Sequence, residues 1–131
     1  LYPMSAGNMI IACHNRIATG IEMDIVERGR AKRLRIVKPG TNWYTASREF
    51  QFIASDLNVI NLYMKPCDGR KEYIETIDVS DIPYRQGKVT RLNIAFNFTA
   101  DNKFTVTIKD RGFGDFVKSS GKVINEQFDI V

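Results

Sequence analysis

The amino-acid sequence predicts an all-β domain, an antiparallel β-sandwich of about eight strands. Apolar and polar residues alternate with the period of two that is typical of a half-buried strand. The alternating runs are roughly six residues long and are separated by segments rich in turn-forming residues. No convincing run of ten or more residues has the period of a helix. At 131 residues, 44% of them hydrophobic, the chain has the size of one domain with one core.

The first predicted strands are residues 20–26 and 34–37. They flank residues 27–30, a polar segment in which Gly29 permits a positive backbone φ. The two strands therefore form a hairpin.

A second hairpin follows in the middle of the chain. Phe50 and Phe52 stand two residues apart on a run that ends near Asp56, and residues 59–64 supply the returning strand. After a turn that contains Pro66 and Gly69, another short strand is predicted at residues 73–79.

The clearest hairpin spans residues 92–110. Apolar residues alternate with polar ones on both sides of a turn-prone segment at 99–103, so one face of this hairpin is buried. A last strand is predicted at residues 123–130, where Ile124, Phe128 and Ile130 share a face. The apolar face of the hairpin comprises Leu92, Ile94, Phe96, Phe98, Phe104, Val106 and Ile108.

Little in the sequence points to catalysis or to a metal. His14 is the only histidine, and Cys13 and Cys67 stand outside any metal-ligand spacing. No glycine-rich phosphate-binding motif is present. We therefore expect that the chain is not an enzyme and holds no metal or cofactor, and that its cysteines are reduced. Because no apolar stretch approaches the roughly 20 residues that cross a bilayer, we expect a cytoplasmic protein without a membrane partner.

Two surface features leave alternatives open. The basic residues of 28–38 could contact nucleic acid, but Arg33 and Arg35 alternate with Lys32 and Leu34, which favours the solvated side of a half-buried ribbon. We therefore expect no nucleic-acid partner. Residues 43–44, Trp-Tyr, could form a stacking platform for a sugar or a base, or could seal one end of the sandwich.

Residues 96–106 read Phe-Asn-Phe-Thr-Ala-Asp-Asn-Lys-Phe-Thr-Val and are followed by Lys109 and Asp110. They are similar, without a gap, to the Phe-Asp-Ile, Asp-Ala-Asp-Gly and final Lys-Asp of the β-sandwich substrate-binding domain in heat-shock protein 70 (DnaK-type) chaperones. Asn102 replaces the family's glycine and also tolerates left-handed backbone angles. Four further segments also resemble the family and occur in the same order: residues 20–22, the loop from Lys38, residues 50–68, and residues 77–83. The resemblance covers roughly residues 9–110.

The resemblance implies a domain division and partners. Met9, Ile10 and Ile11 stand where the family has its apolar interdomain linker, so residues 1–12 are expected to be linker-like and 13–131 to form the sandwich. A nucleotide-binding domain would contact the chain through this linker. ATP and magnesium would belong to that upstream domain alone.

The resemblance also implies binding of unfolded or extended apolar polypeptides as clients, beneath two arching loops. The hairpin around Gly29 is longer than the family's first arch, and Met23 and Ile25 are the candidates to close over the client. The alternative is a docking or assembly module of the same fold whose peptide groove is lost. The implied peptide-binding residues are Ile21, Met23, Phe50, Gln51, Ile53, Leu57 and Ile60.

Overall fold

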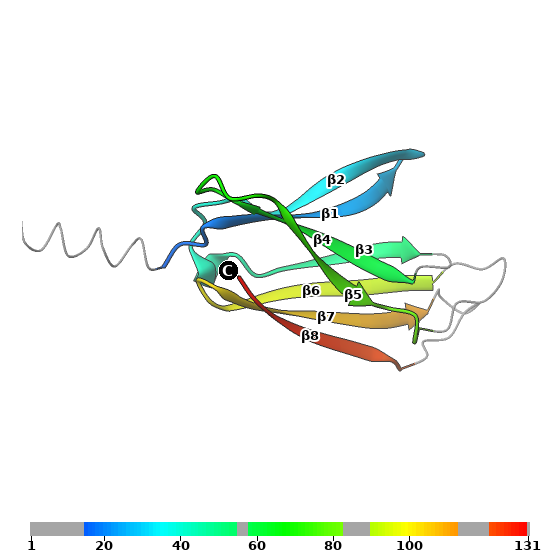
Figure 1. Cartoon of the computed structure of the whole chain (residues 1–131). Helices are drawn as coiled ribbons and strands as arrows, with labels where there is room; N and C mark the ends of the chain where they lie inside the picture. Colours follow the sequence, from blue (N-terminus) through cyan, green and yellow to red (C-terminus); the bar gives the residue numbers. More distant parts are fainter. Residues whose placement is uncertain (1–14, 55–57, 83–89, 113–120, 131) are drawn as a thin grey trace, which may run out of the picture.

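The computed structural model describes residues 15–54, 58–82, 90–112 and 121–130. In this part of the chain eight strands form two antiparallel sheets of four, which confirms the predicted sandwich (Figure 1). None of its helices is long and apolar enough to cross a membrane. The predicted linker with Met9, Ile10 and Ile11 lies outside the described residues, as do Cys13 and His14.

The chain order of the elements follows the predicted hairpins. A single 3₁₀ turn, η1, joins β2 to β3 within the described residues. The elements are β1 (Thr19–Glu27), β2 (Arg30–Val37), η1 (Trp43–Thr45), β3 (Arg48–Ala54), β4 (Val59–Pro66), β5 (Tyr73–Asp78), β6 (Thr90–Ala100), β7 (Lys103–Gly112) and β8 (Val123–Asp129).

The two sheets have the strand orders β2-β1-β4-β5 and β3-β6-β7-β8. Side chains that alternate along the strands fill the space between them, because every second residue of a strand points to the same face. Phe104 is fully buried and stacks between Phe98 and Phe128, with ring centroids 5.3 and 5.2 Å away. Other fully buried core residues are Ile17, Ile21, Ile36, Leu62, Met64, Leu92, Phe96 and Ile108.

The first hairpin is longer than the sequence pattern predicts. β2 begins at Arg30 rather than at Leu34, and Glu27 pairs in register with Arg30. Arg28 and Gly29 have φ angles of 53° and 76°, as both central residues of a two-residue type I′ turn require. The apolar alternation starts only at Leu34 because residues 30–33 are exposed. The sequence pattern therefore does not predict the first half of the strand.

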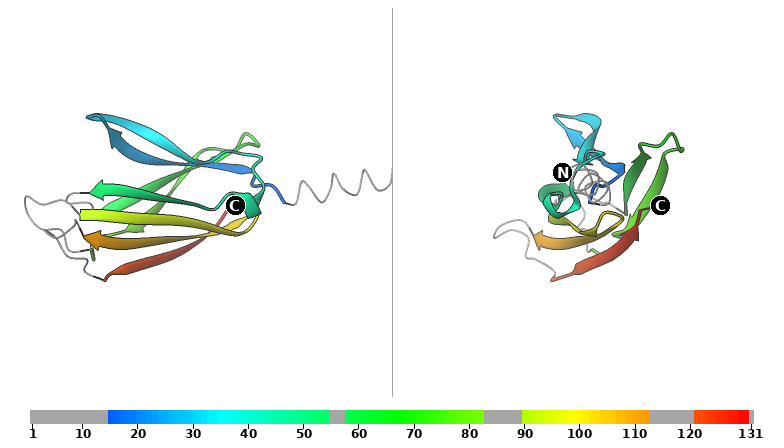
Figure 2. Two further views of the ribbon diagram at one scale, coloured as in Figure 1. Left: turned by 180° about the vertical axis from the view of Figure 1, so that it is seen from behind. Right: turned by 90° about the vertical axis from the view of Figure 1, so that its left-hand side faces the viewer.

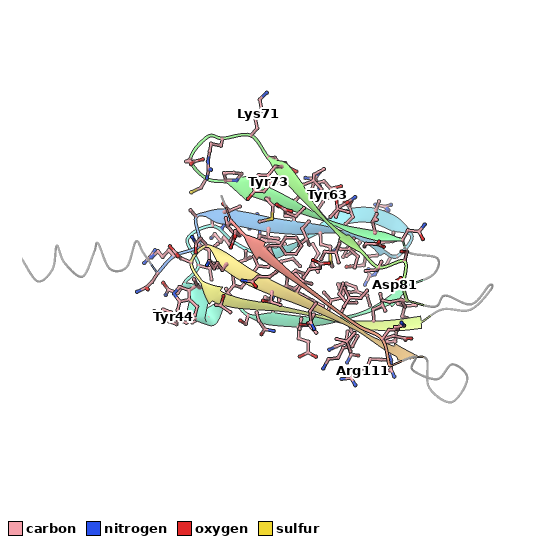
Figure 3. The ribbon with its side chains drawn as sticks, turned by 60° about the horizontal axis from the view of Figure 1, so that its bottom comes forward. Tyr44, Tyr63, Lys71, Tyr73, Asp81 and Arg111 are labelled. Carbon is pink, nitrogen blue, oxygen red and sulfur yellow. The ribbon has the colours of Figure 1, made fainter. Side chains whose placement is uncertain are left out.

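The aromatic pair at η1 lies at the end of the sandwich opposite the β1–β2 turn (Figure 2). Trp43 is half-buried against the core, and its backbone N–H donates a 2.9 Å hydrogen bond to the carbonyl of Asn15. Tyr44 is exposed (Figure 3). Its ring meets the Trp43 ring edge to face. These contacts of Trp43 favour the sealing role over a stacking platform.

Candidate functional site

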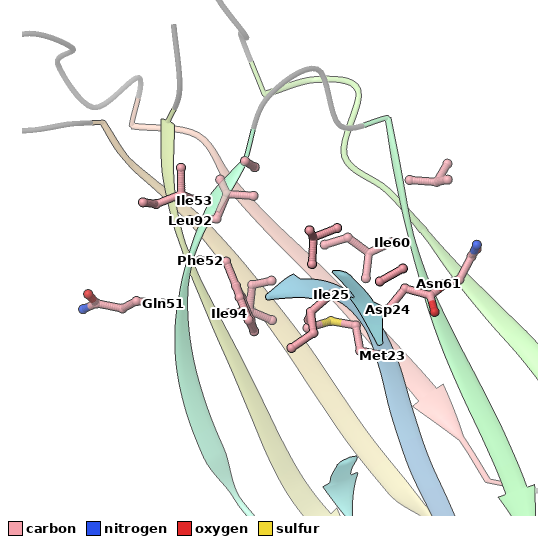
Figure 4. Close-up of a pocket in the computed structure, with 14 residues that line it drawn as sticks. Met23, Asp24, Ile25, Gln51, Phe52, Ile53, Ile60, Asn61, Leu92 and Ile94 are labelled. Carbon is pink, nitrogen blue, oxygen red and sulfur yellow. The ribbon is translucent and has the colours of Figure 1, made fainter. Parts of the chain in front are cut away.

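A cleft of about 950 Å³ opens between the sheets beneath the β1–β2 hairpin (Figure 4). Met23 and Ile25 of β1 face Phe52 of β3 across it, and β4 and β6 complete its walls. The polar residues on its margin are Asp24, Gln51 and Asn61. The apolar side chains of the walls are Met23, Ile25, Phe52, Ile60, Leu92 and Ile94.

The cleft exists because β1 leaves β4 before either strand ends. β1 pairs with β4 only over residues 19–23, whereas residues 24–27 pair with β2 alone. Residues 59–61 of β4 likewise pair with β5 alone. The β1–β2 hairpin therefore rises away from the rest of the sandwich (Figures 1 and 2). In the described part of the chain, this leaves main-chain edges of both strands without a strand partner.

Exposed apolar side chains gather at the mouth of this cleft. Val26, Ile53 and Val59 are 74%, 64% and 45% exposed, and all three line the cleft. They are half of the six large, exposed hydrophobic residues in the described part of the chain. The concentration of exposed apolar surface at one concave place is typical of a binding site.

The structure brings four of the seven predicted peptide-binding residues to the cleft, namely Met23, Gln51, Ile53 and Ile60. Ile21 is fully buried and does not line it. Phe50 is half-buried, meets Phe96 edge to face with ring centroids 6.1 Å apart, and does not line the cleft itself. Its ring stacks on the wall residue Phe52, with centroids 5.8 Å apart. Leu57 lies outside the described residues.

Sequence reasoning did not assign Val26, Phe52 or Val59 to the site, although a signal for them exists. Three pairs of adjacent apolar residues interrupt the period of two near strand ends: residues 25–26, 52–53 and 59–60. In each pair, one side chain points between the sheets and its neighbour remains on the exposed rim. Ile36 and Val37 form the same pattern at the end of β2 and do not line the cleft, so the pattern alone does not single out the site.

A cluster of charged and aromatic side chains ties the base of the hairpin to β4. The Arg33 guanidinium lies 3.6 Å from the centroid of the Tyr63 ring, and its Nη1 donates a 2.9 Å hydrogen bond to Glu72. The Tyr63 hydroxyl donates a 2.6 Å hydrogen bond to Asp24. This hydrogen bond, together with desolvation and the charge of Asp24, raises the pKa of Tyr63. The contacts stand beside the last β1–β4 pairs and so fix where the hairpin diverges.

The basic residues of β2 divide between two faces, as the alternation predicts. Lys32 pairs in register with Ile25 on the core-facing side, and its ammonium group lies 2.8 Å from the Glu27 carboxylate. Arg33 and Arg35 point outward opposite Asp24 and Glu22. The basic cluster therefore forms no single-sided stripe of the kind that tracks a nucleic-acid backbone.

The chemistry available at the cleft is that of apolar contact and hydrogen bonding. Among the residues that the structure describes, no group of three or more His, Cys, Asp or Glu is placed to hold a metal ion. The cleft can bury apolar side chains, and the free main-chain edges of β1 and β4 can exchange hydrogen bonds with an extended backbone.

Comparison with known proteins gives a family without a described activity. A family model described as "Domain of unknown function (DUF8552)" matches residues 16–130. No curated protein and no solved structure matches the chain. The resemblance to the heat-shock-70 substrate-binding domain stays a prediction.

Proposed function

The chain belongs to the DUF8552 family, and we propose that its domain binds extended polypeptide segments without chemical conversion, by taking their apolar side chains into the cleft. The observation that carries this proposal is the rim of exposed Val26, Ile53 and Val59 around an apolar interior. A folded domain gains little from leaving these side chains in water, whereas an apolar ligand would cover them.

The size and shape of the cleft support a side-chain ligand. Its volume of about 950 Å³ leaves room for several apolar side chains, and it is open at one end of the sandwich. Burial of each apolar side chain contributes about 1.5–3 kcal/mol, and each hydrogen bond to the backbone about 1 kcal/mol. After the costs of ordering a flexible segment, affinity in the micromolar range follows.

The same mode of binding is the one that the heat-shock-70 resemblance implies. We accordingly extend the proposal to chaperone-like capture of unfolded clients in the cytoplasm, with this domain as the client-binding part of a larger protein. The open, apolar cleft supports this function over a docking module whose groove is lost.

Fluorescence anisotropy with labelled leucine-containing heptapeptides tests the proposal. Ile53→Asp and Val59→Asp place a charge on the rim, and we expect each to weaken binding at least about ten-fold, because a carboxylate would lose its hydration beneath the peptide. The matched controls are Ile74→Asp and Val123→Asp, whose parent residues are 54% and 50% exposed and do not line the cleft.

Binding by the control variants should stay within about two-fold of the unmodified chain, since exposed positions away from the site contribute little. A peptide in which serine replaces leucine should bind weakly to every variant. Absence of saturable binding, or an equal loss in the rim and control variants, would contradict the proposal.

A further inference from the structure

Among the described residues, four strands lie at the outer edges of the two sheets, β2 and β5 in one sheet and β3 and β8 in the other. An edge strand has a neighbour on only one side, so alternate residues present their N–H and C=O groups to a further strand. Proteins often protect such edges with a charged residue that points toward the core side, because an added strand would bury that charge.

Three of the four edges carry such a residue within the strand. Lys32, Glu75 and Glu126 each occupy a core-facing position on their strand, and each stands opposite an apolar residue of the neighbouring strand. A strand laid beside β2, β5 or β8 would thus meet a charge on its inner side. The register pairs are Lys32 with Ile25, Glu75 with Leu62, and Glu126 with Val106.

β3 is different over most of its length. Its core-facing residues Phe50, Phe52 and Ala54 are all uncharged. Arg48 shares their side of the strand, but it is the first residue, and its guanidinium donates to two main-chain carbonyls of β2 at 3.3 Å. The same guanidinium lies 4.7 Å from the centroid of the Phe50 ring, so these contacts hold its charge at the start of the strand. No charged side chain follows on the inner side from Phe50 to Ala54.

This edge also borders the cleft. Residues 51–54 of β3 line it, and Ile53 is exposed on the outer side of the strand. An added strand beside β3 would send every second side chain into the space between the sheets, next to Phe52. Its remaining side chains would lie beside Gln51 and Ile53 on the outer face.

We propose that the ligand binds as an additional strand along the free edge of β3, as a fifth strand of the β3-β6-β7-β8 sheet. The inference rests on the proposed function and specifies its ligand: an extended segment of up to about seven residues, the length of β3, with an apolar residue at every second position. Alternation is needed because only one side of such a strand faces the cleft.

Labelled heptapeptides of equal composition test the pattern by fluorescence anisotropy. One alternates leucine with serine, and the other groups its leucines at one end. The alternating peptide should bind about ten-fold more tightly, because each apolar residue that leaves the cleft loses its burial. Equal affinities overturn the strand assignment.

N-methylation of the alternating peptide tests the backbone contacts. Two isomers carry N-methyl groups at two alternate residues, one on the odd and one on the even positions. In an edge pairing only one of the two sets of peptide N–H groups points to β3. The isomer methylated on that set should lose two hydrogen bonds and about 25-fold in affinity, at roughly five-fold per bond. The other isomer should lose less than about three-fold. Equal binding by both isomers and the parent peptide overturns strand pairing while the proposed function survives.

Hydrogen exchange locates the added strand. Alternate amides of β3 should become protected when the alternating peptide binds, while amides on the outer edges of β5 and β8 keep their exchange rates. Protection at β2, at residues 24–27 of β1 or at residues 59–61 of β4 in place of β3 overturns the inference. Pairing of β3 with a second copy of the chain in place of the peptide also overturns it. Absence of any peptide binding overturns both the inference and the proposed function.

Discussion

Replacement of Phe104 by leucine should be among the most destabilising conservative changes in the core. Phe104 is fully buried and is the middle ring of a stack of three, 5.3 Å from Phe98 and 5.2 Å from Phe128. Each aromatic pair contributes about 0.5–1.5 kcal/mol beyond the area that it buries, so the loss of two pairs costs about 1–3 kcal/mol. The volume left by the smaller side chain adds about 1 kcal/mol. The expected total is about 2–4 kcal/mol.

Phe128→Leu is the matched control. It removes only one stacked pair, from a position that retains 9% exposure, and should cost about 1–2.5 kcal/mol. Urea unfolding followed by the fluorescence of Trp43, the single tryptophan, gives both free energies of unfolding. Since none of the stacked rings lines the cleft, peptide affinity should not change. A loss below about 1 kcal/mol for Phe104→Leu, or equal losses in the two variants, would refute the reasoning.

Three further predictions concern a close contact, a carboxylate and an edge strand. Gly20→Ala would place a Cβ 3.1 Å from Cδ of Pro39, so we expect a loss of about 1–3 kcal/mol in urea unfolding, smaller when Pro39→Ala is added. The Ser80 hydroxyl and N–H, which donate to Asp78 at 2.6 and 2.9 Å, lower its pKa. The stability that this provides is present above the unfolded-state pKa of about 4 and is lost as pH falls through the lower folded-state pKa. In Asp78→Asn the free energy of unfolding, measured in urea, should therefore fall less steeply as the pH is lowered below about 4. An unchanged dependence on pH would contradict this. Glu126→Val should promote concentration-dependent self-association in sedimentation, whereas Glu126→Lys should remain monomeric; identical behaviour would contradict the protective role of the charge.

The sequence was most informative where one face of a strand is buried. The alternation from Leu92 to Ile108 predicted the β6–β7 hairpin, and the structure confirms it with Leu92, Phe96 and Ile108 at most 1% exposed. The pattern was less informative at the tip of the first hairpin. Residues 30–33 are exposed there, so no apolar contrast marked the start of β2.

The site could be predicted only in part for the same reason. Ile21 and Met23 stand two residues apart on one face of β1, and the sequence offers no local difference between them. Ile21 faces the closed part of the sandwich, whereas Met23 stands at the last β1–β4 pair, where the hairpin begins to diverge and the cleft begins. Their environments depend on β4, about 40 residues further along the chain.

By itself the sequence determined the all-β class, most of the strands and the solvated face of the basic ribbon. These properties are local, because alternation at a period of two records which face of a strand meets water. The tertiary structure alone decided that β1 parts from β4 after Met23, that Ile53 and Val59 line the same cleft, and that β3 is the edge beside the cleft. Strand order and the point of divergence depend on pairing between distant segments, and no short stretch of residues encodes them.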